Sequence, residues 1–153
     1  MKSLRISALP IAIALFVLGV APAALADGHH HRCTLQSVAG EFGYATTGIR
    51  NGIGQVAGVG TLVFDGAGNV VDGMQTVSFG GIIATETYSG TYNVGDDCRG
   101  SFTVNVTSSV PAFNRTSTLD VVWEDNANRA QAIFTGDGTV ITAEAHRVFS
   151  HGD

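Results

Sequence analysis

Apolar and polar residues alternate along most of the chain after residue 40, and turn-forming residues interrupt the alternation at short intervals. From Phe102 to Val106, and again from Leu119 to Trp123, every second residue is apolar. A period of two places successive side chains on opposite faces, which is typical of a β-strand with one buried face. The pattern predicts eight strands, at residues 41–48, 55–64, 69–79, 82–94, 99–108, 116–124, 128–135 and 139–149.

The segment 59–79 indicates how neighbouring strands are joined. Two β-prone runs flank residues 65–69, Asp-Gly-Ala-Gly-Asn, which tolerate positive φ or bond to their own backbone and so favour a short antiparallel hairpin. No amphipathic helix of useful length appears between the other runs. We therefore expect an all-β domain, an eight-stranded antiparallel meander closed as a small barrel, because closure removes exposed edges. A two-sheet sandwich is the alternative.

The same alternation predicts which side chains face inward. In the fourth run, Glu86, Tyr88 and Tyr92 lie opposite a row of threonine and serine residues that suits solvent, so the glutamate and tyrosine side is expected inside. The other residues predicted to face inward are Phe102, Val104, Val106, Leu119, Val121, Trp123, Ala130, Ala132, Phe134, Ile141, Ala143, Ala145, Arg147 and Phe149.

The N-terminus has the layout of a secretory signal peptide. Lys2 and Arg5 precede an uncharged apolar run, and residues 24–26, Ala-Leu-Ala, fit a small-x-small cleavage site. The apolar run is short for a spanning helix, although a membrane anchor is the alternative. We expect a signal peptide at 1–26, a polar histidine-containing segment at 27–40, a barrel domain at 41–150, and a secreted or periplasmic protein.

Charge and cysteine content agree with export. Removal of Lys2 and Arg5 would change the formal net charge from −5 to −7, and an acidic surface without a basic stripe argues against nucleic acid and anionic membrane as partners. No membrane partner is expected after the signal peptide is removed. An oxidising compartment favours a disulfide between Cys33 and Cys98, the two cysteines of the chain. Closing this loop would stabilise the fold by roughly 3 to 4 kcal/mol. A catalytic thiol is the alternative, but no histidine pattern supports it.

Several short sequences resemble those of small secreted bacterial proteins of uncharacterised function. They are residues 38–44 (Val-Ala-Gly-Glu-Phe-Gly-Tyr), 60–69 (Gly-Thr-Leu-Val-Phe-Asp-Gly-Ala-Gly-Asn), 90–94 (Gly-Thr-Tyr-Asn-Val) and 97–100 (Asp-Cys-Arg-Gly).

The expected architecture is similar to the calycin barrels, which include the lipocalins, and to the allene oxide cyclase-type barrels. Lipocalins carry Gly-x-Trp on the first strand and an arginine on the last strand that packs over the tryptophan. Here Gly40, Phe42 and Arg147 occupy the corresponding positions, with phenylalanine in place of tryptophan. The resemblance implies that Arg147 packs over Phe42.

A ligand site is predicted inside the barrel, because several inward residues are small and leave space for one small molecule. Glu86 and Arg147 would pair with each other or bind a polar ligand head, and the aromatic residues would form the walls. The candidate ligand-binding residues are Tyr44, Glu86, Tyr88, Tyr92, Trp123 and Arg147. The alternative is a filled core, with Glu86 and Arg147 at the rims.

Three functions follow from these alternatives. Binding of a small, mainly apolar molecule is the first expectation. A cyclase or isomerase, as the allene oxide cyclase resemblance implies, would use Glu86 as general acid or base with a tyrosine hydroxyl assisting. A structural or surface protein with a filled barrel would use neither.

The N-terminus predicted after cleavage is a candidate metal site. A free amine at Asp27, followed by Gly28 and His29, would offer Cu(II) or Ni(II) four nitrogens in a plane, from the amine, two amides and the imidazole. A polar spacer is the alternative. No other cofactor is expected.

Overall fold

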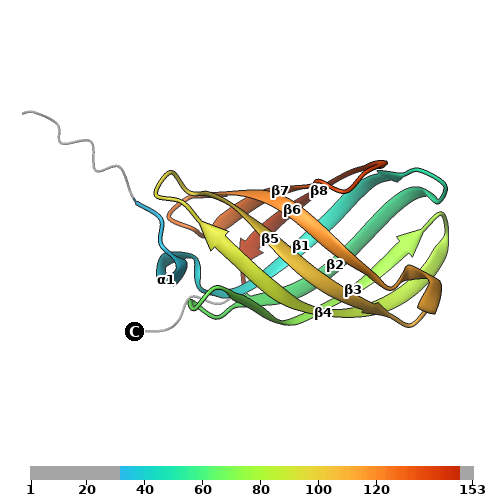
Figure 1. Ribbon diagram of the computed structural model, residues 1–153, viewed down its shortest axis with the longest axis horizontal. Helices are drawn as coiled ribbons and strands as arrows, with labels where there is room; N and C mark the ends of the chain where they lie inside the picture. The colour runs from blue at the N-terminus through green and yellow to red at the C-terminus, as the bar shows by residue number, and fades with distance from the viewer. Residues whose placement is uncertain (1–31, 149–153) are drawn as a thin grey trace, which may run out of the picture.

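The computed structural model describes residues 32–148, which form a closed barrel of eight antiparallel strands in meander order (Figure 1). The elements are α1 (Leu35–Val38), β1 (Gly40–Arg50), β2 (Gly54–Phe64), β3 (Asn69–Phe79), β4 (Ile82–Val94), β5 (Arg99–Ser108), the 3-10 turn η1 (Pro111–Phe113), β6 (Arg115–Glu124), β7 (Arg129–Phe134) and β8 (Thr139–Arg147). The predicted all-β class and the eight-stranded barrel are confirmed, and the strand bounds agree with the prediction to within about two residues.

The barrel closes because β1 pairs with both β2 and β8. In the register of β1 with β2, Gly40 lies opposite Phe64, and in the register of β1 with β8, Phe42 lies opposite Arg147. Every strand therefore has two hydrogen-bonded neighbours, which leaves no free edge and excludes the two-sheet sandwich.

The two ends of the barrel differ. At the closed end, α1 lies against the loops 65–68, 95–98 and 125–128, on the left in Figure 1. At the open end lie the turns 51–53 and 80–81, the loop that contains η1, and the loop 135–138. The closed half is the part of the barrel from the strand midpoints to the closed end, and the open half is the part from the midpoints to the open end.

Aromatic side chains fill the closed half. The ring of Phe64 contacts four others edge-on, with centroid distances of 4.6 to 6.0 Å; these are the rings of Phe42, Tyr92, Phe102 and Trp123. Val38 of α1 is fully buried against this cluster. A smaller apolar cluster around Val77 and Phe79 occupies the open half.

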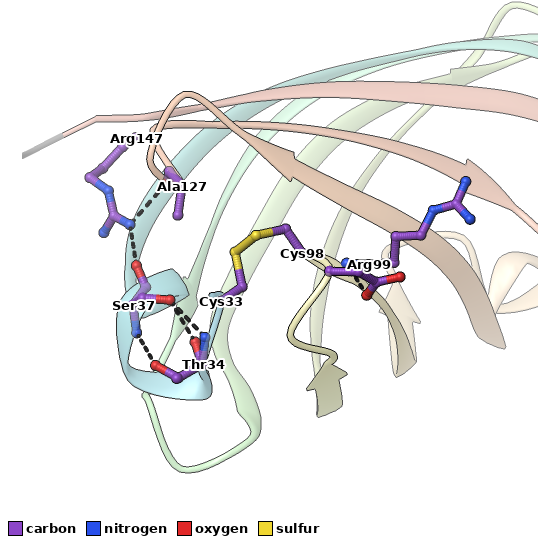
Figure 2. The surroundings of a disulfide bond; sticks show 8 residues. Cys33, Thr34, Ser37, Cys98, Arg99, Ala127 and Arg147 are labelled. Carbon is purple, nitrogen blue, oxygen red and sulfur yellow. Dashed lines mark hydrogen bonds between the residues drawn. A yellow bond between two sulfur atoms is a disulfide. The ribbon is translucent and has the colours of Figure 1, made fainter. Parts of the chain in front are cut away.

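The segment before β1 is anchored to the closed end (Figure 2). The predicted disulfide is confirmed: Cys33 and Cys98 are joined, with Cα atoms 4.9 Å apart. Thr34 begins α1 with a capping box, in which its hydroxyl accepts from the Ser37 N–H and the Ser37 hydroxyl accepts from the Thr34 N–H. The Tyr92 hydroxyl donates to the carbonyl of Leu35 at 3.0 Å. Residues 32–40 therefore fold as a cap on the closed end of the barrel.

The predicted inward face is confirmed where the structure describes it. The inward residues of β5 and β6 are buried, and Glu86 is only 2% exposed. Phe149 lies outside the described residues, as do the signal peptide predicted at 1–26 and the predicted metal ligands Asp27, Gly28 and His29. Within residues 32–148, no helix is both long and apolar enough to cross a membrane.

Candidate functional site

The barrel interior contains two adjoining cavities. The inner cavity, of about 60 Å³, lies within the apolar cluster of the closed half, and the mouth cavity, of about 210 Å³, lies at the open end beside the smaller cluster. Five side chains line both cavities: Thr46, Gln75, Arg115, Ser117 and Phe134. The shared lining shows that the two cavities adjoin.

Short side chains on β7 and β8 create part of the inner space. Ala130 lies opposite Ala145, and Ala132 lies opposite Ala143, so four alanines form one wall. Larger side chains complete the lining, among them Phe42, Leu62 and Tyr88. The prediction that small inward residues leave room inside the barrel is therefore supported by an observed cavity.

Two glycines make room for the tyrosines of this site. A Cβ atom at Gly73 would lie 2.2 Å from a ring carbon of Tyr88, and one at Gly60 would lie 2.7 Å from the hydroxyl oxygen of Tyr44. A larger residue at Gly73 would displace the Tyr88 ring, and one at Gly60 would clash with the Met74 carbonyl as well as with Tyr44. Both glycines therefore help to fix where the two tyrosines lie.

A chain of hydrogen bonds starts at these two tyrosines. The Tyr88 hydroxyl is 2.7 Å from the Tyr44 hydroxyl and 3.0 Å from the carbonyl oxygen of Thr61. The Tyr44 hydroxyl donates to Oε1 of Gln75 at 2.9 Å, and Nε2 of Gln75 donates to Oε2 of Glu86 at 2.5 Å. The Glu86 carboxylate can only accept hydrogen bonds, so the amide of Gln75 turns its NH₂ group toward Glu86. The amide oxygen of Gln75 then faces Tyr44, and the Tyr44 hydroxyl must be the donor.

The chain ends at a buried ion pair. Nη1 and Nη2 of Arg115 donate to Oε1 and Oε2 of Glu86 at 2.7 and 2.9 Å, and Nη1 also donates to the carbonyl of Phe113 at 2.9 Å. The Glu86 side chain is fully buried and that of Arg115 is 14% exposed. The guanidinium carbon lies 5.1 Å from the ring centroid of Phe79. Glu86 thus accepts two hydrogen bonds from Arg115 and one from Gln75, as a buried carboxylate requires.

Burial raises the pKa of Tyr44 and of Tyr88 well above the ordinary tyrosine value of 10.0. The nearby Glu86 carboxylate raises the pKa of both phenols further, since a second negative charge is unfavourable there. Both tyrosines are therefore neutral hydrogen-bonding groups at physiological pH.

The structure places three of the six predicted site residues in or beside the cavity. Tyr44 and Tyr88 line the inner cavity. Glu86 lies behind Gln75 and Arg115, which line the cavity in its place. The predicted pair of Glu86 with Arg147 is wrong, because Glu86 lies in the open half of β4 and pairs with Arg115, whereas Arg147 ends β8 at the closed end.

The other three predicted residues seal the closed end instead of lining the cavity. Tyr92 bonds to α1, and Trp123 packs on Phe64. The Trp123 ring N–H has no hydrogen-bond partner among the described residues. Arg147 donates to the carbonyls of Ser37, Ala39 and Ala127.

The guanidinium carbon of Arg147 also lies 4.8 Å from the ring centroid of Phe42. This is the contact that the lipocalin resemblance implies. A single arginine over an aromatic ring does not by itself name a family.

Gln75 and Arg115 are site residues that the sequence analysis missed. Arg115 immediately precedes the strand predicted at 116–124, whereas in the structure it begins β6. Extending the two-residue period of Leu119 and Ser117 backward by one step would have placed Arg115 on the inner face. Gln75 shares a face with Val77, and the same period would have found it.

Among residues 32–148, no group of three or more His, Cys, Asp or Glu side chains is placed to hold a metal ion. In comparisons with known proteins, no family model, no curated protein and no solved structure matches the chain.

Proposed function

We propose that the barrel binds one small, mainly apolar molecule, which enters through the open end. The observation that carries this proposal is the inner cavity, walled by alanine and aromatic side chains and joined to a wider polar mouth. The two volumes together fall near the lower limit of typical ligand sites, so the ligand is small. Its apolar part occupies the inner cavity and its polar part the mouth.

The polar groups where the two cavities meet limit what the ligand carries. Arg115 donates three of its five N–H groups to Glu86 and Phe113, and the other two have no partner among the described residues. The hydroxyls of Thr46 and Ser117 line the same place. Because Glu86 neutralises Arg115, the site favours a neutral hydrogen-bond acceptor, such as a carbonyl or hydroxyl oxygen, over a free anion.

An enzyme of the cyclase or isomerase type is the less supported alternative. Both oxygens of Glu86 accept hydrogen bonds from Arg115, and Oε2 accepts another from Gln75. No carboxylate lines the inner cavity in the part of the chain that the structure describes. Glu86 would have to leave its ion pair to act as a general base on a ligand.

The proposed place of action is outside the cytoplasm. The Cys33–Cys98 disulfide suits an oxidising compartment. Together with the predicted signal peptide, it supports a secreted or periplasmic protein, and the Arg147 contact with Phe42 supports a calycin-like relationship.

The first experiment compares the native and denatured masses of the protein purified from an exporting host. Extra native mass that is lost on denaturation would identify a bound molecule. The denatured mass also tests the predicted start at Asp27. Binding of a neutral fluorescent probe with one carbonyl oxygen, 6-propionyl-2-dimethylaminonaphthalene, then gives a titratable signal, with energy transfer from Trp123, the one tryptophan of the chain.

Filling the cavity provides the matched test. In Ala132→Leu, three added carbons occupy the inner cavity, and we expect probe affinity to fall at least tenfold with little change in the fold. Ala45→Leu makes the same change on the exposed outer face of β1 and should leave affinity within twofold. Equal affinity in both variants would place the probe outside the barrel and contradict the proposal.

A further inference from the structure

The outer rim of the open end carries exposed aliphatic side chains in several sectors around the mouth. Ile49 and Val140 face each other across the β1–β8 pair and are 54% and 70% exposed. Ile82 and Ile83, which begin β4, are 54% and 63% exposed. The η1 loop adds exposed Pro111 and Ala112 between β5 and β6. We call these six residues the apolar rim.

Acidic side chains are concentrated in the closed half, away from the apolar rim. Apart from the buried Glu86, the described residues include ten acidic side chains, of which only Asp137 lies in the open half. The nine in the closed half are Glu41, Asp65, Asp72, Asp96, Asp97, Asp120, Glu124, Asp125 and Glu144. At the open end, Arg50 offsets Asp137, and Arg115 is neutralised by Glu86. The apolar rim is therefore electrically neutral, and the acidic half points away from it.

The mouth enclosed by the apolar rim stays polar. Arg50, Asp137 and Thr139 line the mouth cavity, together with Thr116 and Thr118 of β6. A second copy or a protein partner pressed onto the rim would remove Arg50 and Asp137 from water, which is costly without matched partners. The headgroup layer of a membrane keeps such groups hydrated while aliphatic side chains enter the acyl boundary.

We propose that the apolar rim docks on an electrically neutral lipid surface, with the mouth facing the membrane. The rim supplies the apolar contact, and the neutral charge of the open end avoids the repulsion that the acidic half would experience at an anionic surface. Docking in this orientation would let an apolar molecule pass between the lipid and the cavity. The docking stands apart from ligand binding, which the probe titration in free solution tests independently.

The experiment is sedimentation of the exported chain, its start verified by mass, with phosphatidylcholine vesicles. We expect a lipid-concentration-dependent bound fraction. Two rim variants, Ile82→Ser with Ile83→Ser, and Ile49→Thr with Val140→Thr, should each weaken partitioning at least fivefold. The control, Val59→Thr with Met74→Ser, alters side chains of similar exposure, 62% and 59%, at the middle of the barrel wall, and should change partitioning less than twofold. Unchanged probe binding and thermal midpoint would show that each variant is folded.

Four outcomes would overturn the proposal. They are no partitioning at millimolar lipid, equal loss in the rim and wall variants, tighter binding to phosphatidylglycerol than to phosphatidylcholine, and a dimer in solution that the rim substitutions dissociate. The last outcome would assign the rim to a second copy of the chain.

Discussion

Glu86 and Arg115 form a buried ion pair beside the cavity, and its desolvation has to be offset by hydrogen bonds. Moving a carboxylate out of water is costly, and Glu86 recovers this cost through three hydrogen bonds from two side chains. Removal of the cation alone would leave the carboxylate buried next to the phenols of Tyr44 and Tyr88. Because Glu86 is buried, it requires Arg115 to neutralise it. Compared with two apolar side chains in the same place, the ion pair adds little to the free energy of folding.

The pair makes a prediction at the residue scale. Arg115→Met should lower the free energy of unfolding by about 3 to 5 kcal/mol, because Glu86 loses its partner. Adding Glu86→Leu to that variant should recover most of the loss, since both charges are then gone. Urea denaturation of the two single variants and the double variant measures this coupling. Additive losses would mean that the ion pair does not form in solution.

At the scale of elements, the cap of the closed end depends on covalent and polar links. The helix α1 has only four residues, so its own hydrogen bonds cannot hold it in place. The disulfide, the Tyr92 bond to Leu35 and the Arg147 bonds to the carbonyls of Ser37 and Ala39 attach it to β4, β8 and the loop before β5. The cap keeps Val38 over the aromatic cluster and closes the barrel opposite to the mouth.

Loss of the disulfide should destabilise the fold while leaving the strands paired. For Cys33→Ser with Cys98→Ser, we expect the free energy of unfolding to fall by about 4 kcal/mol, from the loop of 65 positions that the bond closes. Thr34→Ala, which removes only the α1 cap, should cost about 1 kcal/mol. Chemical denaturation followed by circular dichroism compares the two. A double-serine variant with an unchanged midpoint would contradict the proposed anchoring role.

On the scale of the whole molecule, the three tyrosines couple stability to pH. Burial raises the pKa of Tyr44, Tyr88 and Tyr92, and these are all the tyrosines of the chain. Above about pH 10 the unfolded chain releases tyrosyl protons that the native barrel retains. Their contribution to stability is complete below that pH and is lost as the pH rises, by up to about 1.4 kcal/mol per pH unit for each tyrosine.

Absorbance at 295 nm measures this effect directly. In the native protein, tyrosinate should appear only together with unfolding, whereas in guanidinium chloride it should appear near pH 10. Tyr88→Phe should reduce the slope of stability against pH, because it removes one of the two phenols whose pKa burial raises well above 10. A reversible tyrosinate signal near pH 10 in the folded protein would show that a phenol is open to solvent.

The amino-acid sequence by itself determined the strands, the inner face and the disulfide. A period of two is a local property, so alternation such as that from Leu119 to Trp123 reveals which side chains are buried without knowledge of their neighbours. Two cysteines allow a single pairing. Turn residues such as those at 65–69 connect consecutive strands, and consecutive pairing leads to closure.

Only the tertiary structure decided which inward residues meet. Alternation gives the face of a residue but not its height along the barrel, which depends on strand stagger and on the register shifts between Thr61 and Val63 and between Val70 and Gly73. For this reason Glu86 meets Arg115, whereas the sequence analysis predicted a pair with Arg147. Height also separates Tyr44 and Tyr88 at the cavity from Tyr92 at the closed end. The registers of all eight strand pairs together determine which residues lie at the same height and can meet across the barrel.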